Sequence, residues 1–370
     1  MCGIAGIYNS REDLEYLRNL SSNLIKMLEH RGPDGNGCEV LQQHNNRRTL
    51  LVHTRLSIID LSENGAQPMS DSKGRFFITY NGEIYNHSEL RKELENLGST
   101  FRTNSDTEVI IESYRQWGLE GFERFIGMWA LALWDSTDQQ LILSRDRLGI
   151  KPLFYSEQGG TLAFGSEPKA VLESLKVNPK LNSKAVSDYF SYRYVLGGDS
   201  FFSGINSLEA GTHLICKNGQ TKKIIYWTLP VIENKENFSE GELQDELRSI
   251  LRSSVSYRMI SDVPFGSFLS GGLDSSILVS EMSQIQDDPI KTYTIGFKED
   301  GFNEFEYANE VSEYLETDHT ETVLDADSYL EAMLKMISIK DAPLAVPNEI
   351  ALHKMSKILK RDISVVLSGE

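Results

Sequence analysis

This sequence of 370 residues has few cysteines, no long apolar run and a deficit of basic residues. Its three cysteines, Cys2, Cys38 and Cys216, show no CxxC spacing, so we expect neither a disulfide framework nor a zinc site, and a reducing cytoplasm is the expected location. No apolar run reaches the length of about 18 residues that a transmembrane helix needs, and no basic region precedes the apolar N-terminus as in a secretory signal. A formal net charge of −17 argues against nucleic acid or an anionic membrane as a partner.

The length predicts two domains, because one hydrophobic core usually serves roughly 150 residues. In the first part, the patterns predict helices at 14–28, 86–98 and 104–118, the last opened by a capping box of Ser105 and Glu108. Strands are expected at 50–59 and 75–86, and a meander of antiparallel strands at 128–135, 139–149, 152–159 and 161–167. Helices interleaved with antiparallel strands indicate a layered α+β sandwich.

After about residue 230 the pattern changes to alternating helices and strands. Helices are expected at 241–260, 274–286 and 305–315, and strands at 263–270, 291–297 and 362–368. This alternation predicts an α/β fold with a parallel sheet. We therefore expect a first domain over 2–228, a polar linker over 229–242 and a second domain over 243–370.

The first eight residues, "MCGIAGIY", place a cysteine directly after the initiator methionine. If the methionine is removed, Cys2 carries both a thiol and a free α-amine. These groups titrate near ~8.5 and ~8 in model compounds, so one can take a proton from the other near neutral pH. Cys2 could thus be a nucleophile with its own base, or an ordinary small residue at the chain terminus.

Three further stretches combine charge with unusual backbone: "HTRLSIID" (53–60), "NGEIYN" (81–86) and "NSDTE" (104–108). Asn81 and Gly82 could form an oxyanion hole or an Asn-Gly hairpin turn. Arg55 could bind an anion or be a surface side chain with a buried stem, and Asp106 could bind a cation or interact with a helix N-terminus. Taken singly, each of these residues is better explained by the structural alternative.

Together with "RGPDG", "SDTEVI" and "RDRLGIKPLFY", these stretches resemble the glutaminase domain of class II glutamine amidotransferases, which have the N-terminal-nucleophile (Ntn) hydrolase fold, an αββα sandwich. The resemblance covers about residues 2 to 205. It implies that Cys2 is the nucleophile, that its α-amine is the base and that Asn81 and Gly82 form the oxyanion hole. By the same resemblance, the glutamine pocket is formed by the strand from Arg55 through Leu56, Ser57 and Ile58 to Ile59. Arg55 would pair with the glutamine carboxylate, and Glu83 and Asp106 with its ammonium group.

The stretch "FLSGGLDSS" (268–276) lies between an expected strand and an expected helix, and its uncovered backbone N–H groups suit an anion. It lacks the GxxxxGK[ST] pattern and, with the upstream "VPFG", resembles the PP-loop of ATP pyrophosphatases, which form an adenylate and release pyrophosphate. That resemblance implies ATP and Mg²⁺ as cofactors, with Asp274 binding the metal. By that resemblance, the residues at the nucleotide are Leu269, Ser270, Gly271, Gly272, Ser275, Ser276, Ile295, Ser368 and Gly369. Glu370 would be a catalytic acidic residue that supports formation of the adenylate.

The order of the two motif sets resembles glutamine-hydrolysing asparagine synthetases, in which ATP activates aspartate as β-aspartyl-AMP and ammonia from glutamine, carried through an internal tunnel, displaces AMP. The family continues beyond the position of Glu370, and an end inside a motif favours a fragment over a chain that has lost synthetase activity. Another acceptor carboxylate such as a sugar acid, a stand-alone glutaminase and a non-catalytic nucleotide sensor stay open as alternatives. The expected partners are small-molecule substrates, and a homodimer is left open.

Overall fold

The computed structural model describes residues 1–231, 239–298, 303–324 and 326–369, which form two compact units, Met1–Pro230 and Val231–Glu370. Within the described residues, no helix is both long enough and apolar enough to cross a membrane.

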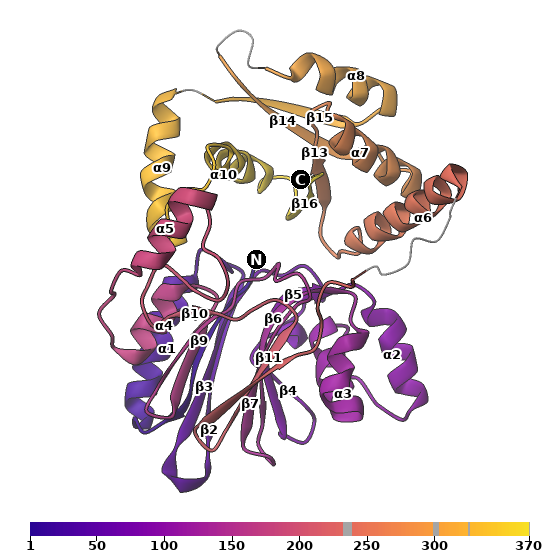
Figure 1. Ribbon diagram of the computed structural model, residues 1–370. Coiled ribbons are helices and arrows are strands. Elements are labelled where there is room, and N and C mark those ends of the chain that lie inside the picture. Colours follow the sequence, from indigo (N-terminus) through magenta and orange to yellow (C-terminus); the bar gives the residue numbers. More distant parts are fainter. Residues whose placement is uncertain (232–238, 299–302, 325, 370) are drawn as a thin grey trace. The chain divides into compact units, whose positions relative to one another are not determined.

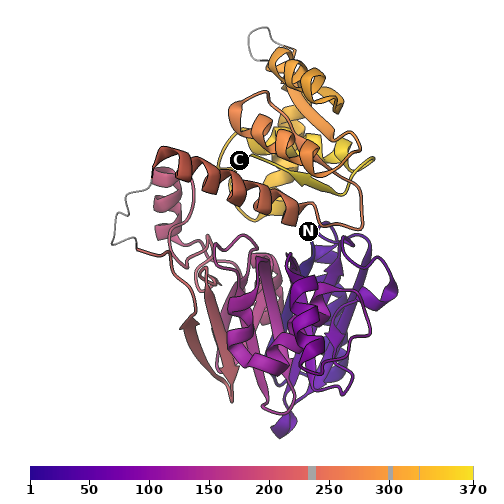
Figure 2. The same cartoon turned by 90° about the vertical axis from the view of Figure 1, so that its right-hand side faces the viewer.

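The first unit contains two six-stranded sheets, each with helices on its outer face (Figures 1 and 2). One sheet has the order β10 (Asn206–Ser207), β8 (Phe154–Gln158), β9 (Thr161–Gly165), β1 (Gly3–Ser10), β3 (Arg48–Arg55) and β2 (Gly35–Gln42). The other has the order β12 (Gln220–Ile225), β11 (Thr212–Lys217), β7 (Gln140–Arg145), β6 (Gly127–Asp135), β5 (Phe76–Ile84) and β4 (Met69–Ser70). The strand pairs in both sheets are antiparallel.

Helices α1 (Leu14–Leu28) and α4 (Pro168–Leu175) pack on the first sheet, and α3 (Asp106–Trp117), with α2 (His87–Asn96) beside it, packs on the second. The alternation of side chains along the strands produces these layers. On β6, Ala130, Ala132 and Trp134 face the core between the sheets, whereas Trp129 and Leu131 belong to the core beneath α2 and α3. The expected αββα sandwich is confirmed. Helix α5 (Ser183–Tyr192) completes the unit.

The second unit contains a four-stranded parallel sheet in the order β15 (Asp318–Leu324), β14 (Lys291–Phe297), β13 (Phe265–Phe268) and β16 (Val365–Leu367). Its helices are α6 (Glu240–Arg258), α7 (Leu273–Ile285), α8 (Phe305–Leu315), α9 (Ala326–Lys340) and α10 (Asn348–Leu359). The expected parallel α/β sheet is confirmed, and its apolar core includes Val255, Leu278, Met282 and Ile290. Much of the expected linker, 232–238, lies outside the described residues.

The structure corrects three details of the sequence analysis. The expected antiparallel pairs are confirmed, but they do not form one continuous run: β7 pairs with β6 in one sheet and β8 pairs with β9 in the other, so the chain changes sheets at 146–153. Strand β3 ends at Arg55, and 56–59 continue as an irregular loop. Ser105 caps α3 by accepting the N–H of Thr107, but Glu108 turns away from it to accept the N–H groups of Arg102 and Thr103, so the reciprocal capping box is wrong.

Candidate active site

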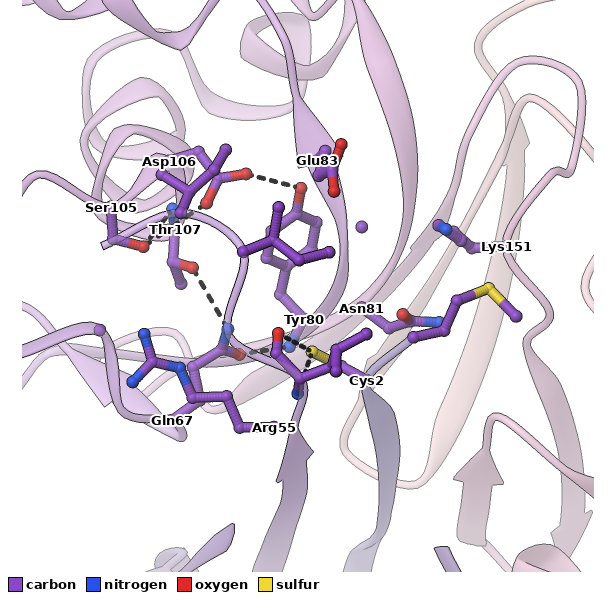
Figure 3. A pocket seen from close by; sticks show the side chains of 16 residues that line it. Cys2, Arg55, Gln67, Tyr80, Asn81, Glu83, Ser105, Asp106, Thr107 and Lys151 are labelled. Carbon is purple, nitrogen blue, oxygen red and sulfur yellow. Dashed lines mark hydrogen bonds between the residues drawn. The ribbon is translucent and has the colours of Figure 1, made fainter. Parts of the chain in front are cut away.

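Cys2 immediately precedes β1 and lines a pocket at one end of the two sheets (Figure 3). Its thiol contacts the loop after β3: Sγ accepts the N–H of Leu56 at 3.3 Å and lies 3.6 Å from the Leu56 carbonyl. Burial raises the pKa of the thiol, and the Leu56 backbone N–H opposes this rise. The cavity measures about 60 Å³, and Met1 is one of the residues that line it.

A cluster of charged residues around Glu167 holds the backbone of Cys2 in place through Arg31. Arg31 Nε donates to the Cys2 carbonyl at 3.0 Å, and Arg31 also pairs with Glu167 at 3.0 Å. Burial disfavours the charged form of Glu167, but hydrogen bonds from His30 and Lys169, with the charge of Arg31, lower the pKa of Glu167 to about 2. Glu167 therefore stays ionised and holds Arg31 against the backbone of Cys2.

Asn81 and Gly82 lie within β5, paired with Ala130 and Trp129 of β6, so the hairpin-turn alternative is wrong. The Asn81 side chain is 1% exposed, and its Nδ2 has no hydrogen-bond partner among the described residues. A buried amide without a partner is costly, so its N–H groups are available to a ligand that enters the pocket. A Cβ atom at Gly82 would lie 2.1 Å from the Met128 carbonyl, so only glycine fits.

Arg55, the last residue of β3, extends its side chain along the pocket (Figure 3). Its guanidinium donates to the carbonyls of Asp60 and of Ser62, the latter at 2.8 Å, which fixes its direction. Leu56, Ile58 and Ile59 also line the pocket. Ser57 is not among the lining residues, and its N–H donates to Asp34 at 2.9 Å.

Two carboxylates from different elements share the pocket. Asp106, in the first turn of α3, is 5% exposed, and its Oδ2 accepts the Tyr80 hydroxyl at 2.9 Å and the Ile84 N–H at 3.0 Å. Glu83 on β5 is 8% exposed, and burial raises its pKa to about 7. The arrangement can hold a zwitterion, because Arg55 suits a carboxylate and the two acids suit an ammonium group.

Tyr80, Gln67 and Lys151 also line this pocket, although the sequence analysis gave none of them a role. Lys151 lies in the stretch "RDRLGIKPLFY", which contributed to the resemblance to the glutaminase domain but was assigned no site residue. No sequence pattern signals the buried bond between Tyr80 and Asp106, because it joins residues 26 positions apart.

A second pocket, of about 440 Å³, lies in the second unit at the carboxyl ends of β13, β14 and β16. Its lining contains eight of the expected nucleotide residues: Leu269, Ser270, Gly272, Asp274, Ser275, Ile295, Ser368 and Gly369. Gly271 and Ser276 lie in the same loop but do not line the pocket, and Glu370 lies outside the described residues.

The loop before α7 is shaped by its serines and by Gly271. Ser275 Oγ accepts the Ser270 N–H at 3.2 Å, and the two hydroxyls lie 3.0 Å apart. Gly271 has φ +76°, and a Cβ atom there would lie 2.4 Å from the backbone of Tyr307. Gly272 caps α7 without a side-chain hydrogen bond, which leaves the helix N-terminus open to an anion.

The second pocket offers Asp274 and Glu304 as carboxylates. The described residues contain no cluster of three or more acidic, cysteine or histidine side chains that could hold a metal by itself. Mg²⁺ usually binds one or two carboxylates together with substrate phosphates, so Asp274 and Glu304 fit a Mg²⁺ ion that arrives with a nucleotide.

A cysteine at the start of an αββα sandwich, facing an unpaired buried amide, defines the first unit as an amidotransferase of the N-terminal-nucleophile type. Comparison with known families agrees, since residues 1–227 match the glutamine amidotransferase domain and residues 246–370 match asparagine synthase. The chain belongs to the family of glutamine-hydrolysing asparagine synthetases.

Its relatives include asparagine synthetase [glutamine-hydrolyzing] 1 of Bacillus subtilis, which is 34% identical over 100% of this chain and 57% of its own length. A putative asparagine synthetase of Methanocaldococcus jannaschii is 35% identical over 100% of this chain and 74% of its own. Amidase chry2 of Gibberella zeae is 30% identical over 94% of this chain and 53% of its own. The chain thus spans little more than half the length of two of these relatives.

Proposed function

We propose that the first unit hydrolyses glutamine. The observation that carries this proposal is the unpaired Asn81 amide in the same buried pocket as the Cys2 thiol. The thiolate attacks the side-chain carbonyl carbon of glutamine, and Asn81 and Gly82 donate to the oxyanion that forms. Ammonia leaves with a proton that the α-amine of Cys2 has taken from the thiol, and water then cleaves the thioester to glutamate.

Removal of Met1 belongs to this proposal. Met1 lines the 60 Å³ cavity, and burial lowers the pKa of its terminal amine to about 6. Its removal gives Cys2 a free amine and enlarges the cavity. Intact-mass measurement should show the chain beginning at Cys2, and 6-diazo-5-oxo-norleucine should label that residue. Full glutaminase activity with the methionine retained would contradict the proposed nucleophile.

We further propose that the second unit activates a carboxylate with ATP. The helix N-terminus at Gly272 and the hydroxyls of Ser270 and Ser275 suit the pyrophosphate, and Asp274 with Glu304 suits Mg²⁺. The carboxylate attacks the α-phosphorus, pyrophosphate leaves, and ammonia displaces AMP from the acyl-adenylate. Aspartate is the proposed acceptor, through β-aspartyl-AMP, because relatives at 34% and 35% identity are named as asparagine synthetases.

Product analysis tests this assignment. The full-length protein, given glutamine, Mg·ATP and aspartate, should release AMP, pyrophosphate and asparagine. ADP and phosphate would contradict adenylation. AMP release that needs a carboxylate other than aspartate would support the alternative acceptor, which the likeness to a protein named as an amidase keeps open. Glutamate without AMP under every condition would support a stand-alone glutaminase.

A further inference from the structure

Lys151 lies in the loop that carries the chain from β7 in one sheet to β8 in the other. The Asp146 carboxylate organises this loop by accepting four backbone N–H groups at 2.9–3.1 Å, those of Trp129, Leu148, Ile150 and Lys151. On the other side, Arg145 donates to the carbonyls of Lys151 at 2.8 Å and Gly149 at 2.7 Å. The backbone of Lys151 is therefore held in one position.

The Lys151 side chain points into the glutaminase pocket (Figure 3). It is 6% exposed and lines the pocket with Cys2, Gly82 and Glu83. Its Nζ makes no hydrogen bond or ion pair within the described part of the chain. Burial of the residue removes much of the water around its ammonium group, which disfavours the charge, so a charged lysine at this pocket requires compensating negative charges.

The charges around Lys151 include such compensation. Burial raises the pKa of Glu83 to about 7, Lys151 opposes this rise, and Asp106 adds to it. Burial lowers the pKa of Lys151, and Glu83 is the largest influence in the opposite direction. The groups that face this pair from the surrounding elements are Cys2 with the terminal amine, Arg31, Asp106 and Asp146.

We propose that Lys151 is a positioning residue for glutamine recognition, whose ammonium group keeps the buried Glu83 carboxylate ionised so that Glu83 can bind the α-ammonium group of the substrate. This inference rests on the proposed glutaminase function. Two carboxylates in one buried pocket repel each other, which favours protonation of one of them. When the substrate is bound, the positive charges of Lys151 and of the substrate ammonium group balance the two negative charges of Glu83 and Asp106.

The test measures glutamine binding against pH in a Cys2→Ala background, where no thiol titrates and no turnover occurs. Glu83 binds the ammonium group only when ionised, so the glutamine Kd should fall as pH rises through about 7. In Lys151→Met the midpoint of this pH dependence should move to higher pH, because Glu83 loses the positive charge that favours its ionised form. A shift of one unit lowers the ionised fraction at pH 7 from one half to about one tenth, so binding at pH 7 should weaken about fivefold.

Three companion variants separate this role from a structural one. Lys151→Arg should restore the midpoint. Glu83→Gln should abolish the transition, and Lys151→Met should cause no further change in that background. Lys223→Met removes one positive charge at an exposed position beside Glu209, on β12, and should leave the profile unchanged. Should Lys151→Met not fold, Lys151→Gln serves for the same comparison.

An unchanged midpoint in folded Lys151→Met would overturn the inference. So would an unchanged glutamine Kd combined with a shifted pH profile of Cys2 alkylation by iodoacetamide, because Lys151 would then act on the thiol. The wild-type protein distinguishes failure of this inference from failure of the proposed function. If the mature wild-type chain begins at Cys2 but shows no glutaminase activity, the glutaminase proposal is contradicted, independently of any result with Lys151.

Discussion

At the scale of single residues, the proposed glutaminase function assigns Arg55 to the carboxylate of glutamine and Asp106, together with Glu83, to its ammonium group. Arg55 is aimed by two backbone carbonyls, and Asp106 is buried with one oxygen bound to Tyr80 and Ile84. Arg55→Ala removes the proposed partner of the glutamine carboxylate, and Asp106→Asn removes one of the two proposed partners of its ammonium group. Hydrogen bonds to charged groups contribute about 1.5–3 kcal/mol, so Arg55→Ala and Asp106→Asn should each raise the KM for glutamine roughly 10- to 100-fold.

Steady-state glutaminase assays measure this change. The control is ammonia-dependent synthesis by the full-length protein, which needs no glutamine and should survive both substitutions. Equal loss of the glutamine-dependent and ammonia-dependent rates would indicate misfolding and contradict a role in binding.

Asn81 should behave differently, because its amide serves the charge that develops during the reaction. Its Nδ2 lies buried without a partner among the described residues, as expected of a donor kept for an oxyanion. Asn81→Ala should lower kcat by about 10²-fold with little change in KM. Unchanged turnover in a folded Asn81→Ala protein would remove this residue from the site.

At the scale of elements, two sets of buried hydrogen bonds connect β5 to α3 and fix the position of Asp106. Tyr80 donates its hydroxyl to Asp106, and Gln67 accepts the Tyr80 N–H at 2.7 Å while its amide contacts Thr107 Oγ1 at 3.2 Å. Burial raises the pKa of Tyr80 well above its usual value, and Asp106 adds to the rise, so the hydroxyl stays a donor.

We therefore expect Tyr80→Phe to weaken glutamine binding while the fold is kept, because the ring still fills its place. One lost hydrogen bond to a carboxylate corresponds to a KM increase of roughly tenfold. Tyr85→Phe is a matched control, since Tyr85 is also buried but does not line the pocket. A KM equal to that of wild type in Tyr80→Phe would show that Asp106 needs no such support.

At the scale of the whole molecule, the two candidate sites lie in different units. Asp274→Asn removes a carboxylate from the second pocket only, so it should abolish release of AMP and pyrophosphate by the full-length protein. Glutamine hydrolysis, measured as glutamate formed without ATP, should continue. Ion-exchange analysis of nucleotides checks the first outcome, and loss of both activities together would contradict the assignment of separate sites.

Elements with a strong local signal could be predicted from the amino-acid pattern alone. Helix α1 follows from the apolar face of Leu17, Leu20, Leu24 and Leu28, and the parallel sheet follows from alternating helices and strands. The residues Cys2, Asn81 and Asp106, chosen by motif and resemblance, do line one pocket. Such motifs are readable because a short stretch of backbone and its own side chains carry the information.

Contacts between residues far apart in the chain could not be predicted in this way, because they depend on how the elements pack. The change of sheet after β7 depends on which strand edges are available, and that is not encoded in the pattern of any one strand. Glu108 does not bond to Ser105 as expected, because its carboxylate accepts the backbone N–H groups of Arg102 and Thr103 in the preceding loop. Lys151 reaches a pocket formed by residues from the first 107 positions because Asp146 and Arg145 fold its loop inward. Burial and the balance of charge are properties of the assembled site, so they became visible only when these elements were brought together.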